Sequence, residues 1–442
     1  MRGSPSDKDS LATSSGLLAL ARMLPSARLI LLTATPDPRS DPLTAVESLR
    51  REHPELGPDL SSAVIAQRSL RYEAIERGLL PADNAWLVTA TGLEQASRPA
   101  VAARRAAWVA GTGTRSVVDA TAGIGMDAAA FAAAGLRVVA VERDPTTAAV
   151  CAANLAALDS AGSTDVICAD STQPGLLAEL AVELPPPVAV FVDPARRGPR
   201  RPSDGSRAHP ERDPERWSPP WSFVESLRAT FEIVLAKTPG SFTPDERWSC
   251  EWVGVAEYVA ECSVFSTTPP GFLSPRQATL LAPIAGADPL TFPAPSGGAL
   301  LDVPVSPPQG FLGEPHPVFH RSLSALCGIG AQRVHETSTW ITTDQVESTR
   351  EIPGVRWYRV IDSAPVKDMK RCAIRHGVDA VAIKCKESKT PLNVLRKKVA
   401  LPDGDHYAVI LTAGTTEAFL VERVLSERVS SGAGGTPPGP PE

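Results

Sequence analysis

The chain lacks an excess of positive charge, paired cysteines and a long uninterrupted apolar run. Its 442 residues carry a formal net charge of -6, so the protein is not a globally basic nucleic-acid binder. Its seven cysteines are scattered without any C-x-x-C pair, which argues against a disulfide framework and favours a reducing cytoplasm. Arg22, Pro25 and Arg28 interrupt an apolar stretch over 17–32, and no run approaches the roughly 20 residues that cross a bilayer.

The chain is long enough for two or three domains, each with its own core. Helical patterns alternate with strand patterns over 117–119, 138–144, 165–170, 188–193, 231–240, 257–265 and 277–283. This alternation predicts a doubly wound α/β sheet. The domains expected are a poorly ordered segment over 1–40, a helical region over 41–110, an α/β domain over 111–293, a linker over 294–312, an α+β domain over 313–425 and a disordered tail over 426–442.

The stretch 117–127 joins a predicted buried strand to a predicted helix through a glycine turn. Such turns bind ligands at the carboxyl end of a parallel sheet. The pattern Gly123-x-Gly125-x-x-Ala128, with Glu142 about twenty residues further on, superficially matches a dinucleotide-binding motif. That pattern alone is weakly specific.

Two carboxylates in the same stretch argue against a dinucleotide. Asp119 ends the strand, three residues intervene before Gly123, and Asp127 lies where the helix begins. Carboxylates at low effective dielectric would repel a pyrophosphate by several kcal/mol. They suit a ligand that carries an ammonium and a sulfonium.

The pattern D-x-x-x-G-x-G, followed by an acid at the next strand end, resembles that of class I S-adenosylmethionine (SAM)-dependent methyltransferases. The chain further resembles a group of bacterial class I methyltransferases that carry a C-terminal THUMP-like domain. The matching stretches are 92–99, 119–127, 193–197 and 313–317, and the likeness extends over residues 42–424. It implies SAM as the cofactor, a Rossmann-like methyltransferase sheet within 111–293 and a THUMP-like domain within 313–425.

The resemblance distributes SAM over the strand ends. The residues expected to bind it are Asp119, Thr121, Gly123 and Gly125 for the methionine portion, Glu142 for the ribose hydroxyls, Asp170 for the adenine amino group, and Gln95 over the pocket. For Glu142 and Asp170 the alternative is a helix cap or a solvated strand end. For the block that contains Gln95 the alternative is a covering helix.

Asp193 and Pro194 end the fourth predicted strand, where the resemblance places the methyl group. Methyltransferases that act on exocyclic amines carry an Asp/Asn-Pro-Pro-aromatic motif there, whereas this chain has Ala195 and Arg196 in the last two places. RNA uridine C5 enzymes carry a similar Asp-Pro-Pro-Arg but need a nucleophilic cysteine shortly downstream. No cysteine lies between 168 and 250, so Asp193 and Pro194 are predicted as catalytic residues for N-methylation.

Basic residues predict RNA as the partner. Arginines follow Asp193 in a long loop, with Trp217 and Trp221 placed to stack on bases. Between 356 and 398 twelve Lys or Arg residues face only four acids. The expected RNA-binding residues are Arg196, Arg197, Arg200, Arg201, Lys384, Lys386, Arg396, Lys397 and Lys398. A solvated loop with two anchoring tryptophans and a solvated charged face are the alternatives.

The sequence therefore predicts a SAM-dependent methyltransferase that N-methylates a nucleobase in RNA. A small-molecule methyltransferase and a SAM- or RNA-binding module without turnover are the alternatives. No metal is expected, because His316-Pro-Val-Phe-His320 has metal-like spacing but no accompanying Cys, Asp or Glu cluster. A membrane partner is not expected either, and the sequence does not indicate an oligomeric state.

Overall fold

The structure is a computed structural model of the whole chain. It describes residues 16–22, 42–81, 85–158, 160–196, 211–256, 258–281, 288–294, 305–306, 310–327, 331–334, 338–344, 354–384, 391–410 and 417–424. Two compact units contain them: unit 1 lies within Met1–Val255 and Val259–Gln277, and unit 2 within Ala256–Tyr258 and Ala278–Glu442. In the part of the chain so described, no helix is both long and apolar enough to cross a membrane.

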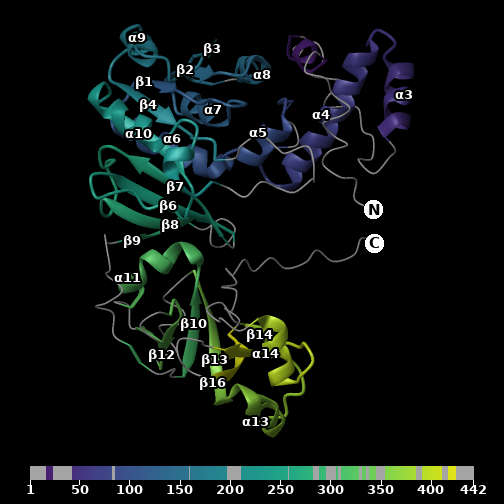
Figure 1. Ribbon diagram of the computed structural model, residues 1–442, viewed down its shortest axis with the longest axis vertical. Helices are drawn as coiled ribbons and strands as arrows, with labels where there is room; N and C mark the ends of the chain where they lie inside the picture. Colours follow the sequence, from purple (N-terminus) through teal and green to yellow (C-terminus); the bar gives the residue numbers. More distant parts are fainter. Residues whose placement is uncertain are drawn as a thin grey trace, which may run out of the picture. The chain divides into compact units, whose positions relative to one another are not determined.

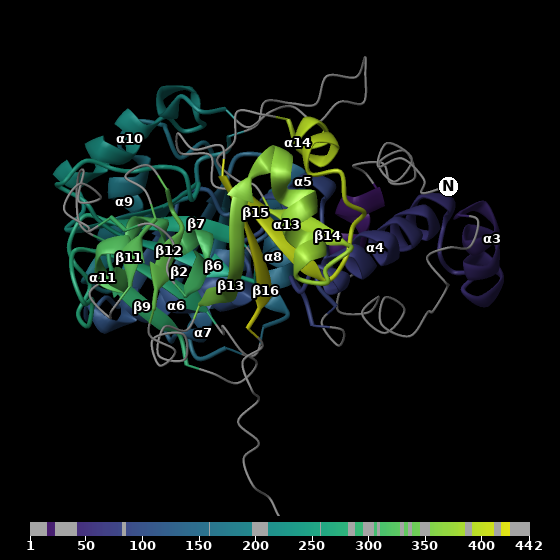
Figure 2. The ribbon, with the colours of Figure 1, turned by 90° about the horizontal axis from the view of Figure 1, so that it is seen from below.

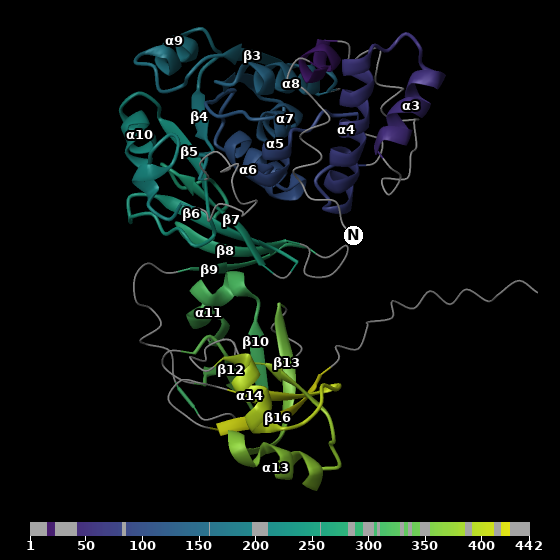
Figure 3. The same ribbon diagram turned by 45° about the vertical axis from the view of Figure 1, so that its right-hand side comes forward.

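Helices open unit 1, which confirms the helical pattern predicted before the first strand. Residues 16–22 are helical, and α3 (Pro42–Glu52), α4 (Pro58–Glu76), α5 (Ala90–Gln95) and α6 (Pro99–Gly111) follow. Proline takes a first-turn position in α4 and α6, where its missing N–H costs no intrahelical hydrogen bond. Helices α3 and α4 lie side by side in Figures 1 and 3.

An extended segment before α5 is fixed by two amide side chains. Gln67 on α4 donates to the carbonyl of Val88 and accepts from its N–H, both at 2.7 Å. Asn154 binds the N–H and carbonyl of Leu87 at 2.8 and 3.0 Å, and also donates to the carbonyl of Ile124 at 2.9 Å. These bonds satisfy the buried backbone in place of a neighbouring strand. They also tie the approach to α5 to the glycine turn.

A parallel sheet forms the centre of unit 1. Its strands are β1 (Ser116–Asp119), β2 (Arg137–Glu142), β3 (Thr164–Cys168), β4 (Val188–Val192), β5 (Ile233–Thr238), β6 (Ser249–Val255) and β7 (Tyr258–Phe265). Among these seven strands the hydrogen-bonded order is β3-β2-β1-β4-β5-β7-β6. The first five strands pair in parallel, and β7 runs antiparallel to β5. The order reverses between β1 and β4, which is where an open parallel sheet binds its ligand.

Helices cover both faces of this sheet. The crossover helices are α7 (Met126–Ala133), α8 (Pro145–Ala156), α9 (Leu176–Val182) and α10 (Trp221–Ser226). Figure 3 shows α6, α7 and α8 on one side of β4 and β5, with α9 and α10 on the other. Strands β1 and β5 are buried along their whole length, as expected for β-branched parallel strands covered on both faces.

Strand β6 is absent from the sequence-based prediction. Its residue Glu251 is only 1% exposed, and a charged residue obscures a buried strand pattern. The structure satisfies Glu251 through Arg104 at 2.8 Å, Trp108 Nε1 at 2.9 Å and Gln277 at 2.8 Å. The seventh strand predicted corresponds to β8 (Arg276–Leu281), whose first two residues belong to unit 1.

Unit 2 contains a mixed seven-stranded sheet. Its strands are β10 (Phe311–Pro315), β11 (Gln332–Arg333), β12 (Ile341–Thr343), β13 (Val355–Pro365), β14 (Val381–Lys384), β15 (His406–Ile410) and β16 (Glu417–Arg423). Strand β9 (Leu290–Pro293), like β8, does not belong to this sheet. The order of the seven-stranded sheet is β11-β12-β10-β13-β16-β15-β14. Within this sheet, only the β14–β15 pair is parallel among the pairings of its described strands. The predicted α+β class is confirmed.

Helices pack on this second sheet and close its core. They are α11 (Leu323–Cys327), α13 (Met369–Arg375) and α14 (Leu392–Val399). Met369 of α13 and Leu395 of α14 share a buried cluster with Leu420 of β16, and Figure 2 shows both helices over strands β14 and β15. Trp340 and Tyr358 pack with Val421 in a separate cluster of the same unit.

Candidate functional site

The glycine turn lies between β1 and α7 and adopts a left-handed backbone. Gly123 has φ 55° and Gly125 has φ 94°, values that side chains other than glycine rarely adopt. A Cβ atom on Gly125 would lie 3.1 Å from Cys151 Sγ, whereas one on Gly123 would meet no atom of the described residues within 4 Å. Gly125 therefore allows close packing of the turn on α8, and Gly123 faces open space that a ligand can enter.

Asp119 ends β1 and is fully buried. Its Oδ1 accepts from the Thr121 N–H at 3.2 Å, and its Oδ2 has no hydrogen-bond partner in the described part of the chain. Burial raises the pKa of Asp119 well above its ordinary value, and the charge of Asp127 raises it further. A buried carboxylate oxygen without a partner is unfavourable, and a cationic ligand at this strand end would reduce that cost.

Glu142 ends β2 and is bound to the same turn. Its Oε2 accepts from the Gly123 N–H at 3.0 Å and its Oε1 from the Asp144 N–H at 2.9 Å. A carboxylate offers about four lone-pair sites, so Glu142 keeps acceptor capacity for two hydroxyls. Contact with the ribose hydroxyls stays a prediction for this residue.

Asp170 follows β3 and is exposed. Its Oδ1 accepts from the N–H and the hydroxyl of Thr172 at 2.9 and 2.7 Å, and these bonds hold the pKa of Asp170 below its ordinary value. The local turn accounts for one oxygen only. Contact with an adenine amino group stays a prediction for the other.

Asp193 follows β4 and is joined to the glycine turn. Its N–H donates to Thr121 Oγ1 at 2.6 Å, so the ends of β1 and β4 are connected directly. The carboxylate is 22% exposed and its Oδ2 lies 2.5 Å from Lys237 Nζ. Burial raises the pKa of Asp193 above its ordinary value, although the charge of Lys237 acts in the opposite direction. Pro194 beside it is buried.

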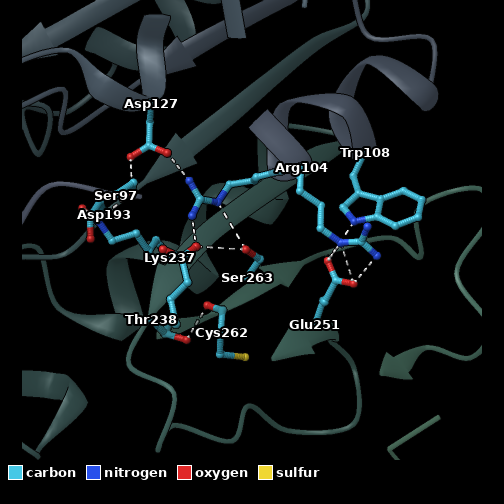
Figure 4. Close-up of polar contacts among 12 residues, drawn as sticks. Ser97, Arg104, Trp108, Asp127, Asp193, Lys237, Thr238, Glu251, Cys262 and Ser263 are labelled. Carbon is cyan, nitrogen blue, oxygen red and sulfur yellow. Dashed lines mark hydrogen bonds and ion pairs between the residues drawn. The ribbon is translucent and has the colours of Figure 1, made fainter. Parts of the chain in front are cut away.

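Lys237 is a residue of this site that the sequence analysis missed. It lies near the end of β5, where a lysine is only 9% exposed, and Figure 4 shows it directed at Asp193. Its Nζ also donates to the backbone carbonyl of Gln95 at 2.9 Å and to Ser97 Oγ at 3.0 Å. Gln95 thus meets the site through its backbone, while its side chain is exposed.

The hydrogen-bond network continues behind the site. Ser97 Oγ donates to Asp127 Oδ2 at 2.7 Å (Figure 4). Arg105, which is 1% exposed, donates to Asp127 and to Glu261 and reaches Ser263 Oγ at 3.2 Å. Each buried charge in this network therefore has a partner, which a buried ion requires.

The predicted RNA-binding residues fall into four groups. Arg197, Arg200, Arg201 and Lys386 lie outside the described residues. Arg196 lies at the start of the loop, where its carbonyl accepts from the Glu211 N–H at 2.7 Å. Lys384 binds Glu314 at 2.8 Å within unit 2. Arg396, Lys397 and Lys398 are exposed on α14, and Arg396 lies 3.5 Å from Asp403.

Trp217 and Trp221 do not offer free faces for base stacking. They are 4% and 8% exposed and pack on Phe242, with ring centroids 5.2 and 4.9 Å apart. Trp221 also contacts Trp248 at 5.3 Å. The prediction that they stack on a base is wrong, because burial of these large apolar surfaces anchors the chain after the loop.

One group of potential metal ligands occurs among the described residues: Asp362, Cys372 and His376, with ligand atoms within 4.8 Å of one another. His376 Nε2 lies 2.8 Å from Asp362 Oδ2, and Arg375 lies 3.7 Å from the same oxygen. The contacts of Asp362 with His376 and Arg375 account for this arrangement. His316 accepts from the Val318 N–H through Nδ1 and faces the Ala256 carbonyl through Nε2, so both ring nitrogens have protein partners.

Comparison with known proteins defines the class. Residues 89–171 match a family described as "Putative SAM-dependent methyltransferase", and residues 355–423 match a family described as "THUMP domain-like". The chain therefore carries a SAM-dependent methyltransferase domain followed by a THUMP-like domain. SAM is the cofactor of the methyltransferase domain, as the resemblance implied. No curated protein matches the chain.

A solved structure of low sequence identity shares this fold, and others match more weakly. A putative methyltransferase from Porphyromonas gingivalis W83 is 17% identical, with a TM-score of 0.63, and the match covers 96% of this chain and 100% of that chain. A putative class I SAM-dependent methyltransferase from Listeria monocytogenes is 10% identical, with a TM-score of 0.30, and covers 62% of this chain and 94% of that chain. A putative rRNA-methylase from Clostridium thermocellum is 15% identical, with a TM-score of 0.24, and covers 37% and 94%.

The residues at the strand ends fit SAM. Asp119 provides an acceptor without a partner beside the turn, which suits a cationic ligand, and Glu142 provides acceptors for hydroxyls. The absence of any side-chain clash at Gly123 leaves room for the ligand against the backbone. Bound SAM supplies a methyl group that its sulfonium already activates.

Proposed function

We propose that the protein N-methylates a nucleobase in RNA, with Asp193 and Pro194 as the catalytic residues. The observation that carries the proposal is the Asp193 carboxylate, which lies at the switch point beside the glycine turn and is partly accessible. A carboxylate there can accept N–H bonds from an amine that approaches the methyl group. Cofactor contacts by Asp119, Thr121, Gly123, Gly125, Glu142, Asp170 and Gln95 belong to the same proposal.

The carboxylate supports this chemistry in two ways. An exocyclic amine is a poor nucleophile while its lone pair is delocalised into the ring, and acceptance of its N–H bonds by Asp193 raises the electron density on nitrogen. After the methyl group has moved, the nitrogen loses a proton, which Asp193 can take up. A pKa raised by burial brings this carboxyl closer to the working pH, as a proton acceptor requires.

RNA as the substrate rests on the basic residues and on the THUMP-like domain. A base leaves its stack most cheaply in loops and single strands, and arginines 196, 197, 200 and 201 follow the catalytic pair along the chain. We propose that these arginines, together with Lys384, Lys386, Arg396, Lys397 and Lys398, contact phosphates. The scattered cysteines support a cytoplasmic location.

A methyl-transfer assay tests the proposal. Tritiated SAM is incubated with the protein and with total RNA, protein and metabolite pools, and label is expected in RNA. Asp193→Asn should lower turnover by roughly 10²–10⁴ while S-adenosylhomocysteine affinity changes only a few-fold. Asp245→Asn, an exposed acid of the same unit, serves as the matched control and should keep full turnover.

Three results would contradict the proposal. Label in the metabolite pool alone would indicate a small-molecule methyltransferase, and SAM binding without label in any pool would indicate a binding module. A C5-methyl pyrimidine formed through a cysteine adduct would remove the role of Asp193.

A further inference from the structure

We propose that Lys237 is a positioning residue for methyl transfer: it binds one oxygen of Asp193 and so directs the other oxygen at the substrate amine. The inference rests on the proposed function, because it concerns the carboxylate to which that function assigns the reaction. It adds a residue that lies on a different strand and that neither the glycine turn nor the Asp-Pro pair includes.

All three donors of the Lys237 ammonium are engaged within unit 1. They bind Asp193 Oδ2 at 2.5 Å, the Gln95 carbonyl at 2.9 Å and Ser97 Oγ at 3.0 Å. An ammonium has three N–H donors and no acceptor. Lys237 therefore has no donor left for a ligand, which excludes a direct contact with the substrate and leaves a role through Asp193.

A buried cation is needed at this place because acids converge on it. Asp119, Asp127 and Asp193 interact electrostatically with one another. Lys237 from β5 and Arg105 from α6 are the cations that lower the pKa of Asp193, and burial together with Asp127 raises it. Loss of Lys237 would therefore favour the protonated form of Asp193, which cannot accept an N–H bond at the protonated oxygen.

The stretch 92–99, which precedes the first strand, gains a physical role from this arrangement. Ser97 accepts from Lys237 and donates to Asp127, and Arg105 binds Asp127 from the other side. Residues 95–97 thus fix Lys237 in position, and Arg105 fixes the carboxylate to which Ser97 donates. The stretch 92–99 before the first strand holds the catalytic carboxylate through Lys237.

Kinetics of Lys237→Met test this role. Methionine has a similar length without charge, so turnover should fall by about 10²-fold, as expected when a reacting group is misplaced by about 1 Å, while S-adenosylhomocysteine affinity changes only a few-fold. The acid limb of the turnover profile should move to higher pH, because the pKa of Asp193 rises when its counter-ion is lost.

Lys237→Arg keeps the charge and should restore part of the turnover. Arg247→Met, at an exposed arginine of the same unit, is the control.

A second measurement does not depend on activity. In a double-mutant cycle, Lys237→Met alone should lower the urea midpoint of unfolding, and addition of Asp193→Asn should restore most of that loss, since the unpaired buried charge is then removed. Ser97→Ala removes one contact of Lys237 and provides a milder variant if Lys237→Met does not fold. It should shift the acid limb in the same direction by a smaller amount.

The outcomes separate the two proposals. If the wild type transfers methyl groups and Lys237→Met does so at the same rate and with the same pH profile, the role of Lys237 is overturned. The proposed function then still stands. Coupling in the unfolding cycle without methyl transfer to RNA by the wild type overturns the proposed function and, with it, the catalytic role of Lys237. Absence of coupling in the cycle overturns the pairing itself.

Discussion

Unit 1 and unit 2 hold their charged side chains in opposite ways. In unit 1 Asp119 at the end of β1 is fully buried, with one oxygen that has no partner in the described part of the chain, and Asp127 near it is buried as well. In unit 2 the charges are mostly exposed and pair with one another, as Arg359 does with Glu422 and Arg371 with Asp368. The first arrangement lowers the free energy of unfolding, whereas the second hardly changes it.

The magnitudes explain why this difference is informative. An exposed ion pair contributes about 0–1 kcal/mol, so its presence says little about function. A buried carboxylate without compensation costs several kcal/mol, and clusters of such groups occur at sites that bind or react. The buried acids of unit 1 therefore indicate a ligand, whereas the basic face of unit 2 indicates at most a surface for contact.

Among the variants that test this comparison, Glu142→Ala should cause the largest loss, and the loss is in cofactor binding. Removal of a charged acceptor should weaken S-adenosylhomocysteine binding by about 1.5–3 kcal/mol, measured by calorimetry. The structure adds a second reason, because Glu142 also binds the Gly123 N–H. Glu142→Gln keeps one acceptor and should lose less. Binding of NADH without binding of S-adenosylhomocysteine would refute the cofactor assignment.

Asp119→Asn should sharpen the comparison through the pH dependence of stability. A raised pKa means that the folded state binds the proton more tightly than the unfolded state does, so ionisation of Asp119 destabilises the fold. This penalty is absent below the ordinary Asp pKa of about 3.9, grows as the pH rises toward the folded value and then stays constant. The free energy of unfolding of Asp119→Asn should therefore exceed that of the wild type at pH 8 by about 1–2 kcal/mol.

The advantage of Asp119→Asn should be smaller at pH 5, and urea unfolding at both pH values measures it. Asp165→Asn is the matched control, because Asp165 lies on β3 of the same sheet with its side chain 64% exposed, and its effect should not grow in this way. The same Asp119 variant should bind S-adenosylhomocysteine more weakly. A stability difference that shrinks as the pH rises would contradict the buried, unpartnered carboxylate.

Sequence patterns predicted most of the fold because they report burial directly. The β-branched run at Val117-Val118 and the turn at Gly123 require no partner from elsewhere in the chain to be interpreted. Strand β6 escaped prediction because Glu251 finds its partners at Arg104 and Gln277, far away in sequence. A pattern of residue types cannot show that a buried charge is compensated.

The same limit explains which residues of the site could be predicted from the sequence. Asp119, Glu142 and Asp193 were predictable, because the carboxyl ends of neighbouring parallel strands meet at one edge. Lys237 was not, since a single lysine near a strand end has many possible positions and its partners Gln95 and Ser97 precede it by about 140 residues. Tryptophans 217 and 221 were misplaced because a loop sequence does not show which of its aromatic residues return to a core.

The basic face of unit 2 was overestimated for a related reason. Counting charges between 356 and 398 leaves out acids that other segments supply. Glu314 binds Lys384, Glu422 binds Arg359 and Asp403 approaches Arg396. The face is therefore less positive in space than in sequence, and individual lysines within it differ in what they can offer to RNA.

The smallest expected effects concern Lys397 and Lys384, two lysines of the basic face that differ in their contacts. Lys397 is exposed on α14, whereas Lys384 lies 2.8 Å from buried Glu314 and over the ring of Tyr358 at 5.2 Å. If RNA is held by phosphate contacts, Lys397→Gln should lower the slope of log affinity against log salt by about 1. A slope smaller by 1 reduces the affinity loss between 50 and 200 mM salt by roughly fourfold.

Lys384→Met should behave differently, because the ammonium already has partners inside unit 2. It should leave the salt slope unchanged while lowering the thermal stability of the protein, since Glu314 loses its nearest cation. RNA binding titrated at four salt concentrations, together with thermal unfolding of both variants, distinguishes the two lysines. A slope that falls for Lys384→Met and not for Lys397→Gln would place the RNA contact at the buried pair, and the division between exposed and internally paired charges in unit 2 would then be wrong.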